Sequence, residues 1–148
     1  MKIFKFGGAS VKDADGVKNV LHVLNTVGHE DVLLVISAMG KTTNALEVVI
    51  KNYFEKSKEL HASLQEVRKY HNQILLDLFE DEDHDVFFDV NAHFDDLEYF
   101  IRSNKSPNYN FVYDQVVSIG ELVSTTIVSH YFNSQGLTNN WIDVRPLI

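Results

Sequence analysis

The first residues able to do chemistry lie in Lys5-Phe-Gly-Gly-Ala-Ser-Val11, directly after a short apolar run. Adjacent glycines let backbone N–H groups approach an anion, a following helix adds its positive N-terminal end, and a nearby lysine neutralises phosphate charge. Lys5, Gly7, Gly8 and Ser10 are therefore candidate phosphate-binding residues. In the alternative interpretation the glycines only form a tight turn and Lys5 is solvated. The local sequence supports both equally.

A second polar segment, Ser37-Ala-Met-Gly-Lys-Thr-Thr43, follows another apolar run and contains Gly-Lys-Thr. A P-loop needs a glycine five residues before its Gly-Lys pair, so that the backbone can open around the phosphates. Val35 occupies that position, and we reject a P-loop. The dinucleotide fingerprint also fails on its glycine spacing. What remains is a loop of hydroxyl and N–H groups at the carboxyl end of a strand, where open α/β sheets bind ligands.

A third candidate is Glu121, which follows Gly120 among mostly apolar neighbours and precedes Ser124 and Thr125. A carboxylate in such surroundings either pairs or caps structurally, or it faces a pocket and binds a cationic group of a ligand. Taken alone, this segment favours the structural role.

Several other kinds of site lack the residues they need. The chain has no Cys, which excludes a disulfide framework, a thiolate metal site and a Cys nucleophile. In the acidic stretch from Asp77 to Glu98, an EF-hand loop beginning at Asp89 would place Phe94 and Phe100 where Gly and Glu are required. The seven His are scattered, and no Gly-x-Ser-x-Gly elbow occurs. We therefore predict no metal site.

Composition places the chain among ordinary folded proteins and narrows its partners. With 148 residues, 45% hydrophobic and 23% charged, one domain can bury a real core. The net charge of -8 arises from the acidic stretch, and no basic cluster that would bind nucleic acid is evident. No long apolar run suggests a signal peptide or a membrane span. We expect a cytoplasmic protein whose partners include neither nucleic acid nor membrane.

The elements that must position these residues begin with a strand–helix–strand unit. Residues 2–6 and 31–36 have the length and apolar character of strands, and residues 17–27 keep helical spacing up to Gly28. The continuous apolar run of the second strand is typical of a parallel strand that is covered on both faces.

Further along, helical spacing predicts several helices and then a third strand. The expected helices occupy residues 46–54, residues from a capping box of Ser63 and Glu66 to residue 78, residues 86–101, and residues 116–131 before Gly136. Residues 141–144 have the character of a strand, and the apolar end Pro146-Leu-Ile148 suggests that the chain is cut from something longer. The predicted fold class is α/β, with a parallel sheet flanked by helices and a helical insertion near residues 45–105.

In order and spacing, these segments resemble the amino acid kinase family, and within it the aspartokinases. The resemblance rests on residues 5–11, 35–44, 120–124 and 141–145, and it covers the whole chain. It implies transfer of the γ-phosphoryl group of MgATP to the β-carboxylate of L-aspartate, which gives 4-phospho-L-aspartate for lysine, threonine and methionine synthesis.

The resemblance also implies roles for individual residues. Lys5 would be catalytic, binding the transferring phosphoryl group, and Gly7, Gly8 and Ser10 would line the phosphate site for ATP. Ser37 and Thr43 would hydrogen-bond the aspartate, and Glu121 would hold its amino group. Magnesium would arrive with ATP rather than on protein ligands.

Two departures from the family pattern limit the resemblance. Ala9 stands where the family usually has a hydroxyl residue. The family's domain is also longer, since it includes a Gly-Arg-Gly-Gly-Ser-Asp motif, a substrate-binding Arg, most of the nucleotide base site and then regulatory domains. Residues 1–148 are thus expected to be the N-terminal, substrate-side part of the kinase domain, inactive in isolation, with the whole enzyme a homo-oligomer.

Three alternatives stay open at this point. The kinase could be fused to homoserine dehydrogenase, a difference that would lie outside this chain. The chain could instead be a stand-alone, non-catalytic module that binds a small anion or an amino acid. It could also belong to an amino acid kinase with a different carboxylate acceptor.

Overall fold

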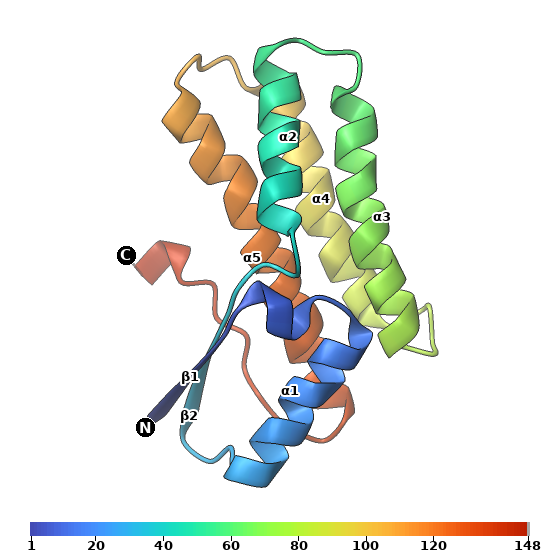
Figure 1. Ribbon diagram of the computed structural model, residues 1–148, viewed down its shortest axis with the longest axis vertical. Coiled ribbons are helices and arrows are strands. Elements are labelled where there is room, and N and C mark those ends of the chain that lie inside the picture. The colour runs from blue at the N-terminus through green and yellow to red at the C-terminus, as the bar shows by residue number, and fades with distance from the viewer. Residues whose placement is uncertain (148) are drawn as a thin grey trace.

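A strand–helix–strand unit opens the chain in the computed structural model, which describes residues 1–147 (Figure 1). Strand β1 (Lys2–Phe6) leads into a short 3-10 helix (Gly8–Val11), helix α1 (Ala14–Val27) and strand β2 (Val32–Ile36). The strands pair in parallel, with Lys5 opposite Val35. Asp13 caps α1 by accepting a 2.8 Å hydrogen bond from the Gly16 amide. The predicted strands and helix of this unit are confirmed.

Only one face of the sheet is covered by the described residues. Phe4, Phe6 and Leu34 point into the core and pack against it, whereas Ile3 and Val35 on the opposite face are 63% and 43% exposed. The expectation of a strand covered on both faces is therefore wrong for residues 1–147. The reason is that the described helices lie on one side of the sheet, so that alternate side chains of each strand face outward.

Four long helices follow the strand–helix–strand unit in the described part of the chain. They are α2 (Thr42–Phe54), α3 (Leu60–Leu78), α4 (Asp85–Ser103) and α5 (Tyr109–Ser134). Figure 1 shows them side by side as a bundle, with the sheet and α1 at one end. The segment predicted to be helical near residues 45–105 is helical, and Gly136, at φ +85°, follows the end of α5 as expected.

The predicted capping box at Ser63, at the start of α3, is wrong. The helix begins at Leu60, and the Ser63 hydroxyl donates to the Leu60 carbonyl from inside the first turn. Ser63 therefore lies in the helix rather than at its N-cap. The break between α2 and α3 was predicted, but the chain re-enters a helix earlier than the motif indicates.

Buried apolar side chains from helices α1 to α5 form one core, and a polar link joins α3 to α4. Arg68 on α3 is mostly buried and donates to Asn91, Asp95 and Glu98 on α4, at distances between 2.7 and 3.1 Å. Three acceptors for one planar guanidinium fix the register of the two helices. The acidic stretch thus has a structural use on this face.

The predicted third strand does not form. Residues 137–144 have no regular structure, and a short 3-10 helix (Arg145–Leu147) follows, while Ile148 lies outside the described residues. The Trp141 ring N–H donates a 2.8 Å hydrogen bond to Thr125 on α5, and Asn139 bonds Ser129 on the same helix. These contacts hold the segment along α5, and in the described residues it does not pair with β1 or β2. No helix within residues 1–147 is both long enough and apolar enough to span a membrane.

Candidate functional site

Two loops meet at the carboxyl ends of β1 and β2. We name residues 7–11 the glycine loop and residues 37–41 the second loop. The Gly40 amide donates a 2.9 Å hydrogen bond to the Gly8 carbonyl, and the Ser37 amide donates a 3.0 Å hydrogen bond to Phe6 at the end of β1. A Cβ on Gly8 would stand 2.6 Å from the Ala38 carbonyl oxygen, so glycine is required there for the loops to approach this closely.

The glycine loop presents open space and N–H donors at the end of β1. Nothing lies within 4 Å of the position that a Cβ of Gly7 would take. In residues 1–147, the Ser10 amide donates to the Gly7 carbonyl, whereas the amides of Gly8 and Ala9 have no protein acceptor. Lys5 is exposed on β1, just before this loop, and forms no ion pair with another described residue. These groups are available to an anion.

Helix α5 packs closely against the second loop. The Ser124 hydroxyl donates a 2.7 Å hydrogen bond to the Ser37 carbonyl. A Cβ on Gly120 would lie only 3.0 Å from the Ala38 Cβ and 3.3 Å from the Thr42 Cγ2, so the small residue lets the helix approach. The third predicted motif is therefore in direct contact with the second.

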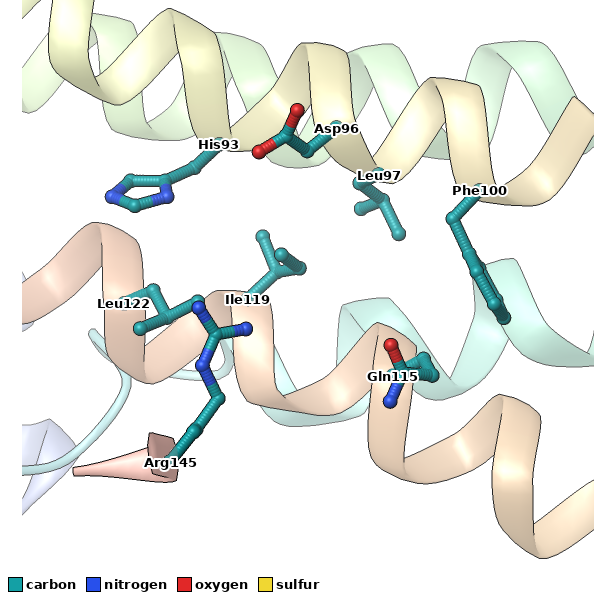
Figure 2. Close-up of a pocket in the computed structure, with 8 residues that line it drawn as sticks. All are labelled: His93, Asp96, Leu97, Phe100, Gln115, Ile119, Leu122 and Arg145. Atoms are coloured by element: carbon teal, nitrogen blue, oxygen red, sulfur yellow. The ribbon is translucent and has the colours of Figure 1, made fainter. Parts of the chain in front are cut away.

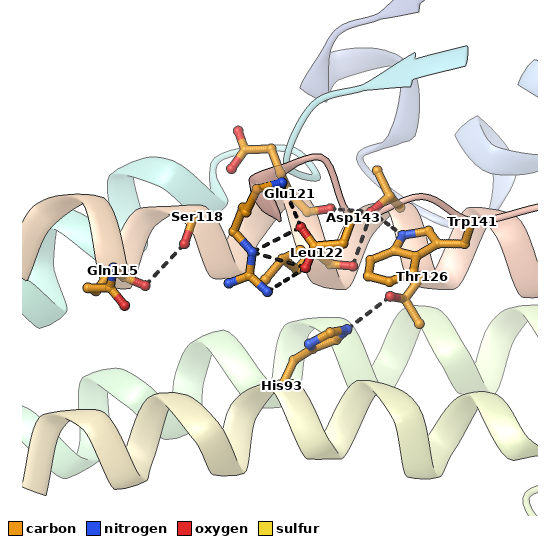
Figure 3. A network of polar contacts seen from close by, with 10 residues as sticks. His93, Gln115, Ser118, Glu121, Leu122, Thr126, Trp141 and Asp143 are labelled. Carbon is orange, nitrogen blue, oxygen red and sulfur yellow. Dashed lines mark hydrogen bonds and ion pairs between the residues drawn. The ribbon is translucent and has the colours of Figure 1, made fainter. Parts of the chain in front are cut away.

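Glu121 is carried to this junction by its neighbour Gly120. Its side chain is exposed and has no hydrogen-bond or ion-pair partner among residues 1–147; only its backbone carbonyl is used, by the Thr125 hydroxyl at 2.7 Å. Figure 3 shows the carboxylate on the side of α5 that faces away from α4. The local sequence favoured a structural role for this carboxylate, but no described residue pairs with it or is capped by it.

Ser37 begins the second loop, and Thr43 lies just beyond its end. Both are half-buried, and Thr43 lies in the first turn of α2. Neither hydroxyl is used in a hydrogen bond with another described residue, in contrast to the neighbouring Thr42, which is buried and donates to the Met39 carbonyl at 2.6 Å. The structure thus brings Lys5, the glycine loop, the second loop and Glu121 to one end of the sheet. Among the described residues, the Lys5 ammonium, the Glu121 carboxylate and the hydroxyls of Ser37 and Thr43 have no side-chain partner there.

Two residues of α3 also reach this region, and the sequence analysis missed both. The Tyr70 hydroxyl donates to the carbonyl of Lys12, just after the glycine loop. The His71 ring is fully buried, with Nδ1 2.8 Å from the Val67 carbonyl oxygen and Nε2 3.3 Å from the Thr42 hydroxyl. His71 lies in the apolar stripe of α3, and that position was the available signal. Burial lowers the pKa of His71 to about 4.

A small cavity of about 100 Å³ lies elsewhere, between α4 and α5. Figure 2 shows His93 and Asp96 on one side of it, Gln115 on the other, and Arg145 reaching in from the C-terminal segment. Arg145 donates from Nε and Nη2 to the Asp143 carboxylate, and this contact lowers the pKa of the Asp143 carboxyl and raises that of Arg145. No residue of the glycine loop or of the second loop lines this cavity.

Comparison with known proteins shows to which family the chain belongs. The model of the amino acid kinase family matches residues 1–147. The bifunctional aspartokinase/homoserine dehydrogenase 2 of Escherichia coli is 30% identical over 147 residues, which is 99% of this chain and 18% of that protein. The chloroplastic aspartokinase 1 of Arabidopsis thaliana is 30% identical over 139 residues, 91% of this chain and 24% of that protein.

Solved structures show the same fold. E. coli aspartokinase III in complex with aspartate and ADP aligns with a TM-score of 0.78 at 23% identity, over 98% of this chain and 31% of that one. Its complex with lysine and aspartate aligns with a TM-score of 0.81, also at 23% identity, over 98% and 32%. The curated relatives described here are much longer, since the chain spans only 18% and 24% of them. The resemblance to aspartokinases of the amino acid kinase family is therefore confirmed, and it covers only a part of the length of these relatives.

Proposed function

Because this chain belongs to the amino acid kinase family, we propose that its loop junction is the aspartate-binding side of an aspartokinase active site. The proposal is supported by the names of its relatives, which are aspartokinases alone or fused to homoserine dehydrogenase. The observation that carries it is the hydrogen bond between Gly40 and Gly8, because it joins the predicted phosphate loop to the predicted substrate loop.

In this proposal the reaction transfers the γ-phosphoryl group of MgATP to L-aspartate. An oxygen of the aspartate β-carboxylate bonds to the γ-phosphorus, the bond from that phosphorus to the ADP oxygen breaks, and the products are 4-phospho-L-aspartate and ADP. Such a transfer needs alignment and charge neutralisation rather than a covalent enzyme intermediate. Magnesium enters as part of the nucleotide substrate and neutralises phosphate charge.

The glycine loop would hold the phosphate that moves. Lys5 would place its ammonium on the transferring group and act as the catalytic cation, in keeping with its exposure and its lack of an ion pair in residues 1–147. Gly7, Gly8 and Ser10 would line the site, because the space beside Gly7 is open and the Gly8 amide has no protein acceptor among the described residues.

The second loop, the first turn of α2 and helix α5 would hold the acceptor. Ser37 and Thr43 would donate hydrogen bonds to aspartate carboxylates, since neither hydroxyl is used within the described residues. Glu121 would bind the ammonium group, which makes an α-amino group a condition of tight binding. A dicarboxylate without that group would leave Glu121 without a cationic partner.

The remaining parts of the site would come from elsewhere in a longer protein. We propose that residues 1–148 are the N-terminal, substrate-side part of the kinase domain, that the base of ATP is bound mainly outside them, and that further strands extend the sheet. The isolated chain would then be inactive or nearly so. The homo-oligomer and the cytoplasmic location expected from the sequence stay predictions. Monofunctional and fused relatives both match, so the proposal is limited to the kinase.

The test is a phosphoryl-transfer assay on the protein at its native length. With MgATP and L-aspartate, hydroxylamine should trap the acyl phosphate as the hydroxamate. Glu121→Gln should raise the KM for aspartate at least tenfold, because a charged partner of the ammonium is lost. Glu47→Gln, which alters an exposed glutamate on α2 bonded to Tyr113, is the matched control and should leave that KM unchanged.

Two outcomes would overturn the proposal. Aspartate binding without any transfer would favour the non-catalytic module, and transfer only to another carboxylate would favour a different amino acid kinase. An equal effect of Glu121→Gln and Glu47→Gln would remove Glu121 from the site.

A further inference from the structure

Helix α3 lies outside the strand–helix–strand unit, yet one of its side chains contacts the second loop and the residue directly after the glycine loop. The Tyr70 hydroxyl donates to the carbonyl of Lys12, directly after the glycine loop. The same oxygen lies 2.6 Å from the position that a Cβ of Gly40 would take in the second loop. One hydroxyl group therefore touches two segments that approach each other at the carboxyl ends of the strands.

Gly40 is the residue that makes this contact possible. Its φ of +54° is left-handed, a conformation that costs other residues free energy. The absence of a side chain also leaves the space that the Tyr70 hydroxyl occupies. Because the Gly40 amide donates to Gly8, a shift of Gly40 would be transmitted to the glycine loop.

The next residue of α3 packs beneath Thr42, which follows the same end of the second loop as Gly40. This residue, His71, is buried, and its Nδ1 donates to the Val67 carbonyl, which leaves Nε2 as the bare nitrogen of the neutral ring. The Thr42 hydroxyl lies between two acceptors, the Met39 carbonyl oxygen at 2.6 Å and His71 Nε2 at 3.3 Å. Two consecutive residues of α3 therefore contact the C-terminal end of the second loop and the residue that follows it.

We propose that Tyr70 is a positioning residue for phosphoryl transfer, which sets the spacing of the glycine loop and the second loop through Lys12 and Gly40. This inference rests on the proposed function, because the two loops are there assigned to the phosphate and to the acceptor. Transfer between them depends on alignment to within a fraction of an ångström. Tyr70 itself is not expected to touch either substrate.

The first experiment compares Tyr70→Phe with Tyr113→Phe in the protein at its native length. Tyr113 is a matched control, since its hydroxyl is also in a hydrogen bond, to Glu47, away from both loops. Tyr70→Phe should lower kcat about fivefold, the effect of one lost hydrogen bond, with little change in the KM for aspartate or MgATP. Tyr113→Phe should leave kcat and both KM values unchanged.

Hydrogen exchange followed by mass spectrometry supplies a readout that needs no activity. Tyr70→Phe should speed exchange in peptides covering residues 37–43 and 8–13, and the control should not. Unchanged exchange at both loops, or a kcat equal to that of the wild type, overturns the positioning role. If the wild-type protein transfers no phosphate, the proposed function fails, while these exchange data still decide whether Tyr70 holds the loops.

A double-mutant cycle tests the contact at Gly40. Gly40→Ala should slow turnover both through its left-handed φ and through the clash with the Tyr70 hydroxyl. The fold-loss from Gly40→Ala should therefore be smaller in the Tyr70→Phe background than in the wild type. Equal losses in the two backgrounds would contradict a direct role of this contact.

Discussion

The amide of Gly40 donates a 2.9 Å hydrogen bond to the carbonyl of Gly8, so that the two loops at the end of the parallel sheet are joined backbone to backbone. Contacts of this kind are stiff, because neither partner can change rotamer to escape strain. A substitution that moves the backbone of one loop is therefore expected to move the backbone of the other.

The two glycines of the glycine loop should respond differently to alanine. A Cβ on Gly8 would meet backbone oxygens of Ala38 at 2.6 Å and Gly40 at 2.9 Å, which cannot yield without moving the second loop. Gly8→Ala should lower the free energy of unfolding by about 2 kcal/mol. Urea denaturation of the native-length protein measures this change.

Gly7→Ala is the matched control, since nothing lies within 4 Å of its Cβ position. Its free energy of unfolding should change by less than about 0.5 kcal/mol. Phosphoryl transfer should nevertheless fall, because the methyl group would occupy space assigned to phosphate. Equal destabilisation by the two substitutions would contradict the loop geometry.

Ser124 should matter for the attachment of α5 to the second loop. Ser124→Ala removes the 2.7 Å hydrogen bond to the Ser37 carbonyl and leaves that acceptor without its partner. The expected loss is about 1 to 2 kcal/mol of unfolding free energy, together with weaker aspartate binding. Ser118→Ala, on the same helix, removes only a local bond to Gln115 and should have little effect on either quantity.

The buried ring of His71 predicts a pH dependence of stability. Its pKa is lowered by burial from 6.5 to about 4 in the folded state, with the Val67 hydrogen bond opposing the shift. Between these values the unfolded chain binds a proton that the folded chain does not. The contribution is fully present above pH 6.5 and is lost as pH falls towards 4, at about 1.4 kcal/mol per pH unit.

Chemical denaturation between pH 5 and 7.5 can isolate this contribution. His71→Gln should flatten the dependence between pH 5 and 6.5, where His71 accounts for roughly 2 kcal/mol. His61→Gln, at an exposed position of the same helix, should leave the slope as it is. An NMR titration of His71 in the folded protein with a midpoint near 6.5 would contradict the prediction.

The strand–helix–strand unit could be predicted because its signals are local. The apolar run up to Ile36, the helical spacing of α1 and the glycine pair after Phe6 each depend on neighbouring residues alone. The meeting of the two loops followed from parallel pairing, which brings the carboxyl ends of both strands to one edge.

Features that depend on distant partners could not be predicted in this way. Trp141 begins a run with the character of a strand, but the Trp141 indole bonds Thr125 on α5, so the segment follows that helix rather than an edge of the β1–β2 sheet. Tyr70 contacts Lys12 across the fold, a relationship that no spacing in the sequence indicates. The exposure of Val35 on the uncovered face of the sheet could not be predicted either, because it depends on which elements pack against the strand and not on the composition of the strand.

The most direct test of the account is the rate of phosphoryl transfer in Lys5→Met and Lys2→Met variants of the native-length protein. Both lysines are exposed on β1, but only Lys5 borders the glycine loop. With MgATP and L-aspartate, Lys5→Met should lower kcat by about 100-fold, because the cation on the moving phosphoryl group is lost, while Lys2→Met should keep nearly the wild-type rate. Near-normal turnover by Lys5→Met in a folded protein would contradict the assignment of the loop junction as the site of transfer.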